Sequence, residues 1–154
     1  MRKSSKRLKS IKTYLKRKVN MREECVFCNE EKLEGKIIFS NVLCKYIELD
    51  NKILIGSGII ITQRHRKTIF DVILVEWISF FFMMRKVRKY MEKKYKPDGY
   101  NIGWNINEVG GQEVYHVHMH IIPRYFDEPY AGRGIRYWIK KEENTRESMK
   151  GEVK

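Results

Sequence analysis

Three histidines stand at alternate positions in one short stretch of the sequence, as His116, His118 and His120. The positions between and after them hold apolar residues, Val117, Met119 and Ile121. This alternation predicts a β-strand within residues 112–124, with apolar side chains on one face and three imidazoles on the other. Each imidazole has two nitrogens that need hydrogen-bond partners, so a row of three rings is unfavourable in a core and indicates a site.

An imidazole that is neutral near pH 7 can act as a nucleophile toward phosphorus. The product would be a phosphoryl- or nucleotidyl-histidine, which water then cleaves. Such a ring must be held in one tautomer, commonly by a backbone carbonyl on its other nitrogen, and the phosphate oxygens need hydrogen-bond donors. The candidate donors are Asn105, Asn107, Gln112 and the backbone amides around Gly110 and Gly111.

Cys25 and Cys28 form a C-x-x-C pair that invites a metal ion. Two cysteines with two histidines make a closed tetrahedral Zn²⁺ site, which is structural because no coordination position stays open. His65 is the only histidine outside the alternating stretch, so the pair, His65 and one of the three histidines form a candidate set. A redox pair remains an alternative, although no βαβ pattern surrounds the cysteines. Cys44 lies alone in an apolar run, and we expect it in the core.

The positive charge of the chain is concentrated at its N-terminus. The 154 residues carry a formal net charge of +13, and residues 1–20 hold nine of the 32 Lys and Arg but no acid. The remainder has 23 basic against 19 acidic residues and is only mildly basic. We interpret residues 1–20 as a basic arm, either a solvated tail or a contact for RNA or another polyanion.

No segment of the sequence is typical of a signal peptide or a membrane span. The N-terminus lacks an apolar h-region, and the most apolar segment, residues 69–84, is too short and contains Asp71 and Glu76. We therefore expect a cytoplasmic protein with no membrane partner.

The remaining pattern predicts an α+β domain. Strands are expected at residues 36–39, 43–49, 53–61 and 100–106, besides the histidine strand, which makes an antiparallel sheet of about five strands. A long helix is expected over residues 72–94, with one apolar stripe formed by Ile73, Trp77, Phe80, Met84, Val87 and Met91. Phe81, Phe82 and Met83 widen this stripe and favour a homodimer. The domain would span residues 21–139, before a charged C-terminal tail at 140–154.

Several segments resemble the histidine triad (HIT) superfamily of nucleotide hydrolases and transferases. Residues 111–124 fit the family pattern G-Q-x-V-x-H-x-H-x-H-x-x-P-R, and residues 25–28 resemble the C-x-x-C of its zinc-containing members. Residues 56–65 and 97–103 are similar to two further strands of the family. Residues 127–136 resemble the C-terminal segment of members similar to diadenosine polyphosphate hydrolases.

The resemblance implies a HIT-like fold, a homodimer and a role for each matching residue. His118 would be the nucleophile that takes the nucleoside monophosphate, and His120 would bind the phosphate. Gln112 and Asn105 would hold phosphate oxygens and the leaving group. In zinc-containing members the ligands of the structural ion match Cys25, Cys28, His65 and His116.

Some positions depart from the family pattern. Glu113 stands where many members have Ser or Thr against the phosphate, so its charge would alter the choice of leaving group. The acidic residue that binds the ribose aligns with Leu49 without a gap, and we assign it to Asp50 by allowing a one-residue deletion. Asn107 replaces a glycine, and Asn tolerates positive φ better than most residues.

The sequence thus predicts an enzyme that attacks the α-phosphate of a purine dinucleoside polyphosphate or nucleoside phosphoramidate. One alternative is a metal-dependent hydrolase in which the three histidines ligate a catalytic ion. Another is a non-catalytic module that binds nucleotides or RNA.

Overall fold

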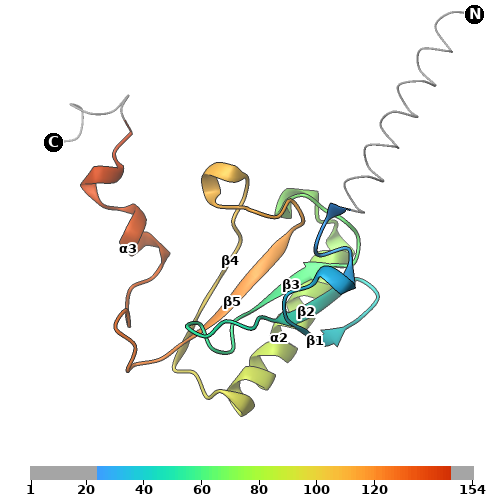
Figure 1. The fold of residues 1–154 in the computed structure, drawn as a ribbon, viewed down its shortest axis with the longest axis horizontal. Helices are drawn as coiled ribbons and strands as arrows, with labels where there is room; N and C mark the ends of the chain where they lie inside the picture. The colour runs from blue at the N-terminus through green and yellow to red at the C-terminus, as the bar shows by residue number, and fades with distance from the viewer. Residues whose placement is uncertain (1–23, 147–154) are drawn as a thin grey trace, which may run out of the picture.

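The computed structural model describes residues 24–146, so the predicted basic arm at 1–20 lies outside the described residues. Its strands form one antiparallel sheet with the order β1-β2-β3-β5-β4. Their bounds are β1 Lys36–Ser40, β2 Cys44–Glu48, β3 Gly58–Thr62, β4 Gly99–Gly103 and β5 His118–Arg124. The long helix is α2, Leu74–Lys94 (Figure 1). The predicted α+β fold, with five strands and one long helix, is confirmed.

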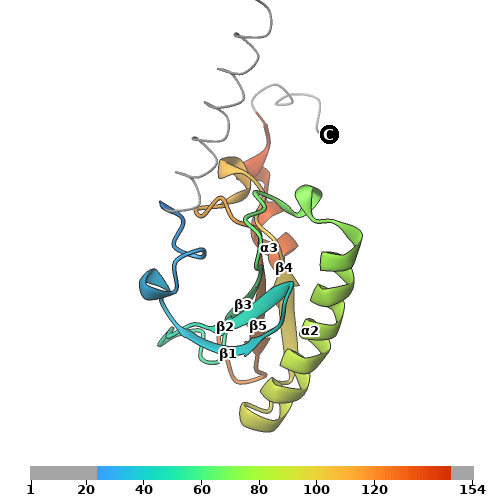
Figure 2. The same ribbon diagram turned by 90° about the vertical axis from the view of Figure 1, so that its right-hand side faces the viewer.

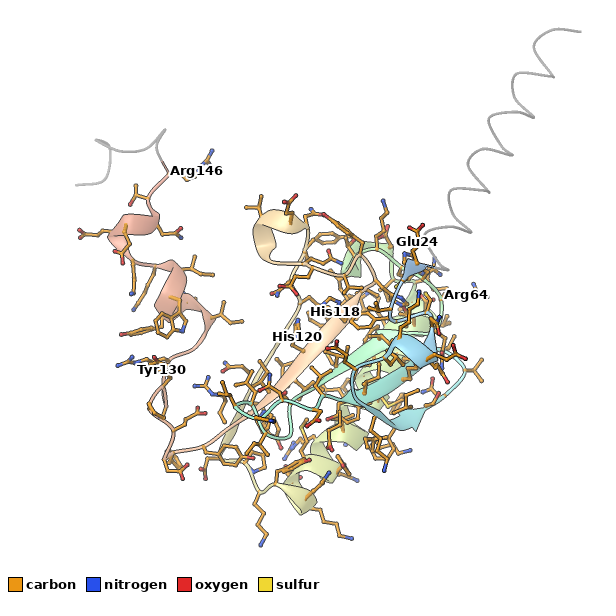
Figure 3. All side chains as sticks on the ribbon, in the orientation of Figure 1. Glu24, Arg64, His118, His120, Tyr130 and Arg146 are labelled. Atoms are coloured by element: carbon orange, nitrogen blue, oxygen red, sulfur yellow. The ribbon has the colours of Figure 1, made fainter. Side chains whose placement is uncertain are left out.

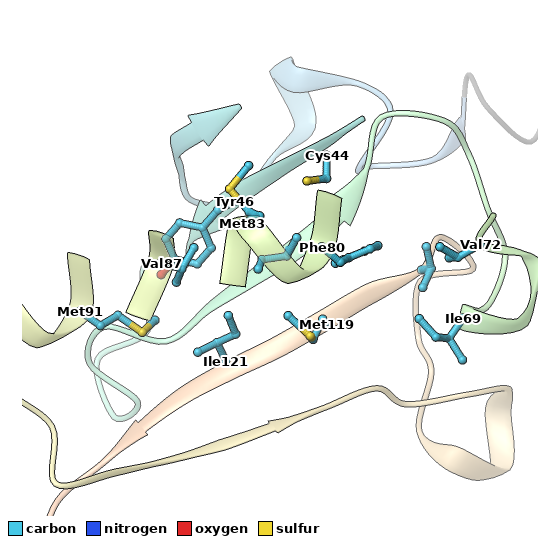
Figure 4. Close-up of a cluster of buried hydrophobic side chains, with 12 residues drawn as sticks. Cys44, Tyr46, Ile69, Val72, Phe80, Met83, Val87, Met91, Met119 and Ile121 are labelled. Atoms are coloured by element: carbon cyan, nitrogen blue, oxygen red, sulfur yellow. The ribbon is translucent and has the colours of Figure 1, made fainter. Parts of the chain in front are cut away.

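The sheet separates two layers. Helix α2 covers one face, and the segment that begins at Glu24 and includes the short 3-10 helix η1, Glu30–Lys32, lies on the other (Figure 2). The core under α2 joins both elements through buried apolar side chains, among them Tyr46, Phe80, Val87, Met119 and Ile121 (Figure 4). Cys44 belongs to this core, as expected. A smaller cluster on the opposite face contains Ile47, Ile59 and Ile61 with Phe27, Leu33 and Leu49 against it.

Helix α2 begins two residues later than predicted, and its buried stripe is rotated. A 3-10 helix, η2 Ile69–Asp71, precedes it, and Glu76 accepts a hydrogen bond from the backbone N–H of Ile73 at 3.0 Å. Glu76 is 1% exposed because Arg66 pairs with both of its carboxylate oxygens. The stripe therefore includes Glu76, while Ile73 and Trp77, predicted to be buried, are 44% and 40% exposed.

The segment at 53–61 is a strand only in its second half, since β3 begins at Gly58. A Cβ atom at Gly58 would lie 2.4 Å from the ring of Tyr46, which is itself fully buried. Only glycine permits this close approach of the Tyr46 ring to the backbone of β3.

Two short helices follow the sheet, on either side of residue 140. The short helix α3, Ile135–Ile139, and the 3-10 helix η4, Glu142–Asn144, lie to the side of β4 and away from α2 (Figure 1). None of the helices within residues 24–146 is long and apolar enough to cross a membrane. Several apolar side chains of α2 are solvent-exposed, including Phe81 at 49% and Phe82 at 63%.

Candidate functional site

Strand β5 begins at His118, so the prediction of one strand face with three imidazoles is wrong for His116. The backbone N–H of His116 donates to the carbonyl oxygen of Val114 at 2.8 Å, which is a turn rather than a strand. The neighbouring N–H of Val117 donates to Arg66 in the loop after β3. These contacts turn the buried ring of His116 toward Thr62 and the cysteines.

His118 and His120 remain together at the start of β5, where their ring centroids lie 4.9 Å apart (Figure 3). The Nδ1 atom of His118 is 2.7 Å from the carbonyl oxygen of His116. Because a carbonyl only accepts hydrogen bonds, Nδ1 carries the proton and Nε2 keeps a lone pair. Burial lowers the pKa of His118, although the same hydrogen bond and the charge of Glu113 oppose the shift.

Both rings line a pocket of about 490 Å³. Its lining includes polar and charged side chains, Lys32, Glu34, Asn105 and Glu113. The apolar part of the lining comes from the segment before β1 and from the sheet. Its residues are Val26, Phe27, Leu33, Leu49 and Ile59. The pocket can hold a flat apolar group, such as a nucleobase, beside the two imidazoles.

His120 is the better candidate for binding a phosphate oxygen. Its Nε2 atom is buried, and none of residues 24–146 hydrogen-bonds to it. A buried polar atom without a partner is unfavourable unless a ligand supplies one. Burial lowers the pKa of His120, and the neighbouring His118 lowers it further.

Gln112, predicted to contact the phosphate, does not line this pocket. Its side chain is buried, and its amide nitrogen donates to the carbonyl oxygens of Lys67 at 2.7 Å and Val114 at 3.1 Å. Its amide oxygen accepts from the backbone N–H of Asn107 at 2.9 Å. In this geometry Gln112 holds the loop in front of the histidines.

The other predicted nucleotide-binding residues are divided between the pocket and its surroundings. Asn105 lines the pocket and donates to the carbonyl oxygen of Gly111 at 3.1 Å. Asn107 has a φ of +58°, as its replacement of a glycine suggested, but it does not line the pocket. Asp50 is exposed and outside the lining, whereas Leu49 is part of it.

The backbone amides proposed as phosphate donors are used within their own turn. The N–H groups of Gly110 and Gln112 both donate to the carbonyl oxygen of Asn107, at 3.1 and 3.0 Å. The N–H of Gly111 donates to Glu108 at 2.9 Å. The Gly-Gly turn therefore shapes the loop and does not present these three donors to a ligand.

Cys25, Cys28, His65 and His116 bring four potential metal ligands together, with all ligand atoms within 4.8 Å of one another. Cys28 Sγ lies 3.4 Å from Nδ1 of both histidines, and Cys25 Sγ lies 3.6 Å from Nδ1 of His116. Sulfur and nitrogen ligands at the corners of a tetrahedron around Zn²⁺ are about 3.5 Å apart. The spacing of these four side chains fits such an ion.

The protonation of His116 also fits a metal ligand. Its Nε2 atom lies 2.9 Å from the carbonyl oxygen of Thr62, which fixes the proton there and leaves Nδ1 facing the cysteines. Burial lowers the pKa of His116 to about 4, with a further contribution from His65, so the ring is neutral at physiological pH. Within the described chain, His118 and His120 are not members of this cluster. The arrangement does not favour three histidines around one catalytic ion.

Two supporting contacts were not predicted from the sequence. Phe27, between the two cysteines, places its ring 5.2 Å from that of His118 and 6.0 Å from that of His116. Lys45 on β2 is buried and bonds to Glu30 at 3.0 Å, which holds the segment that carries the cysteines on the sheet. The position of Phe27 between the two cysteines was the one sequence feature that could have indicated the first contact, and none indicated the second.

Residues 32–127 match the HIT domain family. The chain is 33% identical over 110 residues to an uncharacterised HIT-like protein of Methanocaldococcus jannaschii, over 66% of this chain and 79% of that protein. It is 39% identical over 72 residues to the asymmetrical bis(5'-nucleosyl)-tetraphosphatase of Schizosaccharomyces pombe, over 47% of this chain and 40% of that protein. A crystal structure of a HIT family protein from Bacillus anthracis superposes with a TM-score of 0.62 at 24% identity, over 68% of this chain and 75% of that one.

Proposed function

Because this chain belongs to the HIT domain family, we propose that it is a nucleotide hydrolase that uses His118 as its nucleophile. In this reaction Nε2 of His118 attacks the α-phosphorus of a purine nucleotide substrate. The bond from Nε2 to phosphorus forms as the bond to the leaving group breaks. Water then cleaves the nucleotidyl-histidine and releases a nucleoside monophosphate.

The hydrogen bond between Nδ1 of His118 and the carbonyl oxygen of His116 is the observation that supports this proposal most directly. It holds the ring in the tautomer whose Nε2 has a free lone pair. The ring also lines the pocket that is large enough for a nucleoside. Nucleophile and substrate would thus meet without a rotation of the side chain.

The remaining residues would bind and position the substrate. His120 would contact a phosphate oxygen through Nε2, and Asn105, which lines the same pocket, would hold a further oxygen or the leaving group. The apolar wall with Phe27 and Leu49 would contact the base or ribose. Gln112 would act indirectly, by fixing the loop around residues 107–112 through its hydrogen bonds to Asn107 and Lys67.

We further propose that Cys25, Cys28, His65 and His116 hold a structural Zn²⁺ ion. The ion would link the segment at the N-terminus of the domain to the loop after β3 and to the turn before β5. It supplies a cross-link when bound, while the chemistry of the reaction stays with the imidazoles.

Two substrate classes are compatible with this reaction. The similar proteins of Schizosaccharomyces pombe and Saccharomyces cerevisiae are named as a bis(5'-nucleosyl)-tetraphosphatase and a bis(5'-adenosyl)-triphosphatase, which supports dinucleoside polyphosphates. Nucleoside phosphoramidates present the same α-phosphorus with an amine as leaving group.

The proposed partners rest on other parts of the chain. The exposed apolar side chains Phe81 on α2 and Ile102 on β4 support a homodimer that forms through α2 and β4. An RNA or other polyanion partner for residues 1–20, and a cytoplasmic location, follow from the sequence pattern and stay predictions. Gel filtration tests the homodimer, and cell fractionation tests the location. RNA binding at increasing salt, compared between the full chain and a chain that starts at Met21, tests the polyanion partner.

Mass analysis of the trapped intermediate tests the mechanism. The full chain is mixed with an adenosine 5'-phosphoramidate and quenched in mild base, and peptides are searched for adenylate on the segment 115–124. We expect adenylate on His118 in the native protein and none in His118→Asn. Turnover by His118→Asn at the native rate would contradict the proposal, provided that nucleotide binding to this variant is nearly unchanged.

A further inference from the structure

One peptide group lies between the two histidine sites, and both of its polar atoms are used. The carbonyl oxygen of His116 accepts the hydrogen bond from Nδ1 of His118 at 2.7 Å. The N–H of the same peptide, which belongs to Val117, donates to the carbonyl oxygen of Arg66 at 2.6 Å. The peptide is planar and trans, so its N–H and C=O point in opposite directions. The carbonyl of Arg66 therefore fixes the direction of the acceptor that orients His118.

Arg66 lies in a loop without helix or strand, between the end of β3 and η2. The backbone of such a loop is more mobile than that of a strand, so the direction of this carbonyl depends on further contacts. The guanidinium group of Arg66 supplies one. Its Nε and Nη2 atoms donate to the two carboxylate oxygens of Glu76 in α2, at 3.0 and 3.1 Å. This two-pronged geometry restricts both side chains more than a single hydrogen bond would.

The carboxylate of Glu76 is held on the helix side of the ion pair. It is buried, and it also accepts from the backbone N–H of Ile73 at the start of α2. Separation of the pair would leave this buried charge without its partner, which is strongly unfavourable. The first turn of α2 is thus connected to His118 through the side chain of Arg66 and then through two backbone groups.

We propose that the Arg66–Glu76 ion pair positions the nucleophile. The inference rests on the proposed function, because it requires that His118 attacks phosphorus. Neither Arg66 nor Glu76 lines the pocket of the two imidazoles, so both act through the 116–117 peptide. Loss of the pair lets this peptide turn. The Nδ1–H group of His118 then loses its acceptor, and Nε2 is no longer held in the orientation for attack.

Glu76→Gln is the first test, because the amide has nearly the size of the carboxylate and can still accept from Ile73. It lacks the charge that holds the guanidinium group. We expect the single-turnover rate of adenylate formation on His118, from an adenosine 5'-phosphoramidate, to fall about 10- to 100-fold, because catalysis depends on the alignment of the reacting groups. The dissociation constant for AMP should stay within about twofold, since the pair acts on the chemical step and not on binding.

The tautomer of His118 gives a readout that needs no substrate. Nitrogen chemical shifts of the full-length protein, labelled with ¹⁵N-histidine, distinguish a ring with its proton on Nδ1 from one with its proton on Nε2. We expect the native ring to carry the proton on Nδ1 and the ring in Glu76→Gln to show a mixture of the two tautomers. An ion pair that only stabilises the fold would leave the tautomer unchanged.

Two further variants separate positioning from stability. In Arg66→Met/Glu76→Met, apolar side chains replace the whole ion pair, a change that commonly preserves the stability of a buried site. This double variant should be at least as stable toward urea as Glu76→Gln and equally slow. Glu48→Gln is the matched control, because it removes the carboxylate that pairs with Lys94 at the other end of α2. It should keep the native rate and the native tautomer.

The outcomes separate the inference from the proposed function. A native rate and a native tautomer in Glu76→Gln would overturn the positioning role and leave the nucleotidyl-histidine mechanism intact. A native rate in the double variant would also overturn it, since stability alone would then explain the loss in Glu76→Gln. No adenylate on His118 of the native protein would overturn the proposed function, and this inference with it.

Discussion

The Nδ1 atom of His118 hydrogen-bonds to the carbonyl oxygen of His116 at 2.7 Å, so the proposed nucleophile is held by the backbone of a proposed metal ligand. The ring of His116 is in turn held by the carbonyl oxygen of Thr62 on β3. Two alternating histidines thus have different surroundings, since His116 contacts Cys28 and His118 lines the pocket. Metal binding is therefore expected to affect catalysis indirectly, through the fold that positions His118.

Variants of the two histidine sites should separate metal binding from chemistry. Cys25→Ala removes one ligand of the cluster, so we expect loss of bound zinc and a lower melting temperature. His118→Ala lies outside the cluster and should retain the zinc of the native protein while losing turnover. Metal analysis by mass spectrometry, with melting curves before and after chelation, measures both. Loss of zinc from His118→Ala would favour a catalytic ion on the histidines instead.

Gln112→Ala should destabilise the fold as well as slow the reaction. The substitution removes the hydrogen bonds that the Gln112 side chain makes with the backbone N–H of Asn107 and the carbonyl oxygen of Lys67. The loss of a typical hydrogen bond lowers the free energy of unfolding by about 0.5–1.5 kcal/mol. Denaturant unfolding measures this loss. If Gln112 contacted the phosphate directly, activity would fall with no change in stability.

Much of the fold was predictable because its signals are local. The alternation of Val117, Met119 and Ile121 placed these side chains correctly in the core under α2. The helix stripe was misplaced at Ile73 and Trp77 because Glu76 is buried by Arg66, ten residues away in the chain, and no local pattern shows that pair.

The sequence alone reduced the candidate metal ligands to Cys25, Cys28, His65 and one of the three alternating histidines. Residue spacing could not show that the four side chains meet. His116 leaves the strand pattern because its ring meets Thr62 and the cysteines, which are contacts between distant segments. The contacts of Gln112 could not be predicted for a related reason, since its amide bonds to Lys67, 45 residues earlier. Local patterns identify which residues form a site, whereas the division of tasks depends on tertiary contacts.

Gly58→Ala should destabilise the protein, and Gly99→Ala should not. A methyl group at Gly58 would overlap the buried ring of Tyr46 and the carbonyl oxygen of Ile47, so we expect a loss of about 1–3 kcal/mol. Gly99 is also a strand glycine, yet a methyl group there meets no atom within 4 Å. Denaturant unfolding of both variants at one protein concentration measures the difference. Equal stabilities would show that β3 can move away from β2 without loss.

The stability of the fold should fall in acid through Glu48. Burial opposes ionisation of this carboxyl, but hydrogen bonds from Lys94 and Tyr90, both at 2.8 Å, outweigh burial and hold its pKa below the ordinary value of 4.5. A group whose pKa is lower in the folded state stabilises the fold above its unfolded pKa, and this contribution is lost as the pH falls through the folded value. Glu48→Gln removes the titrating group. We therefore expect the stability difference between the native protein and Glu48→Gln to be largest above about pH 5 and to shrink below about pH 4. Urea unfolding across this range measures it, with Glu108→Gln as the exposed control. A difference that stays constant with pH would mean that the bonds to Glu48 do not depend on its charge.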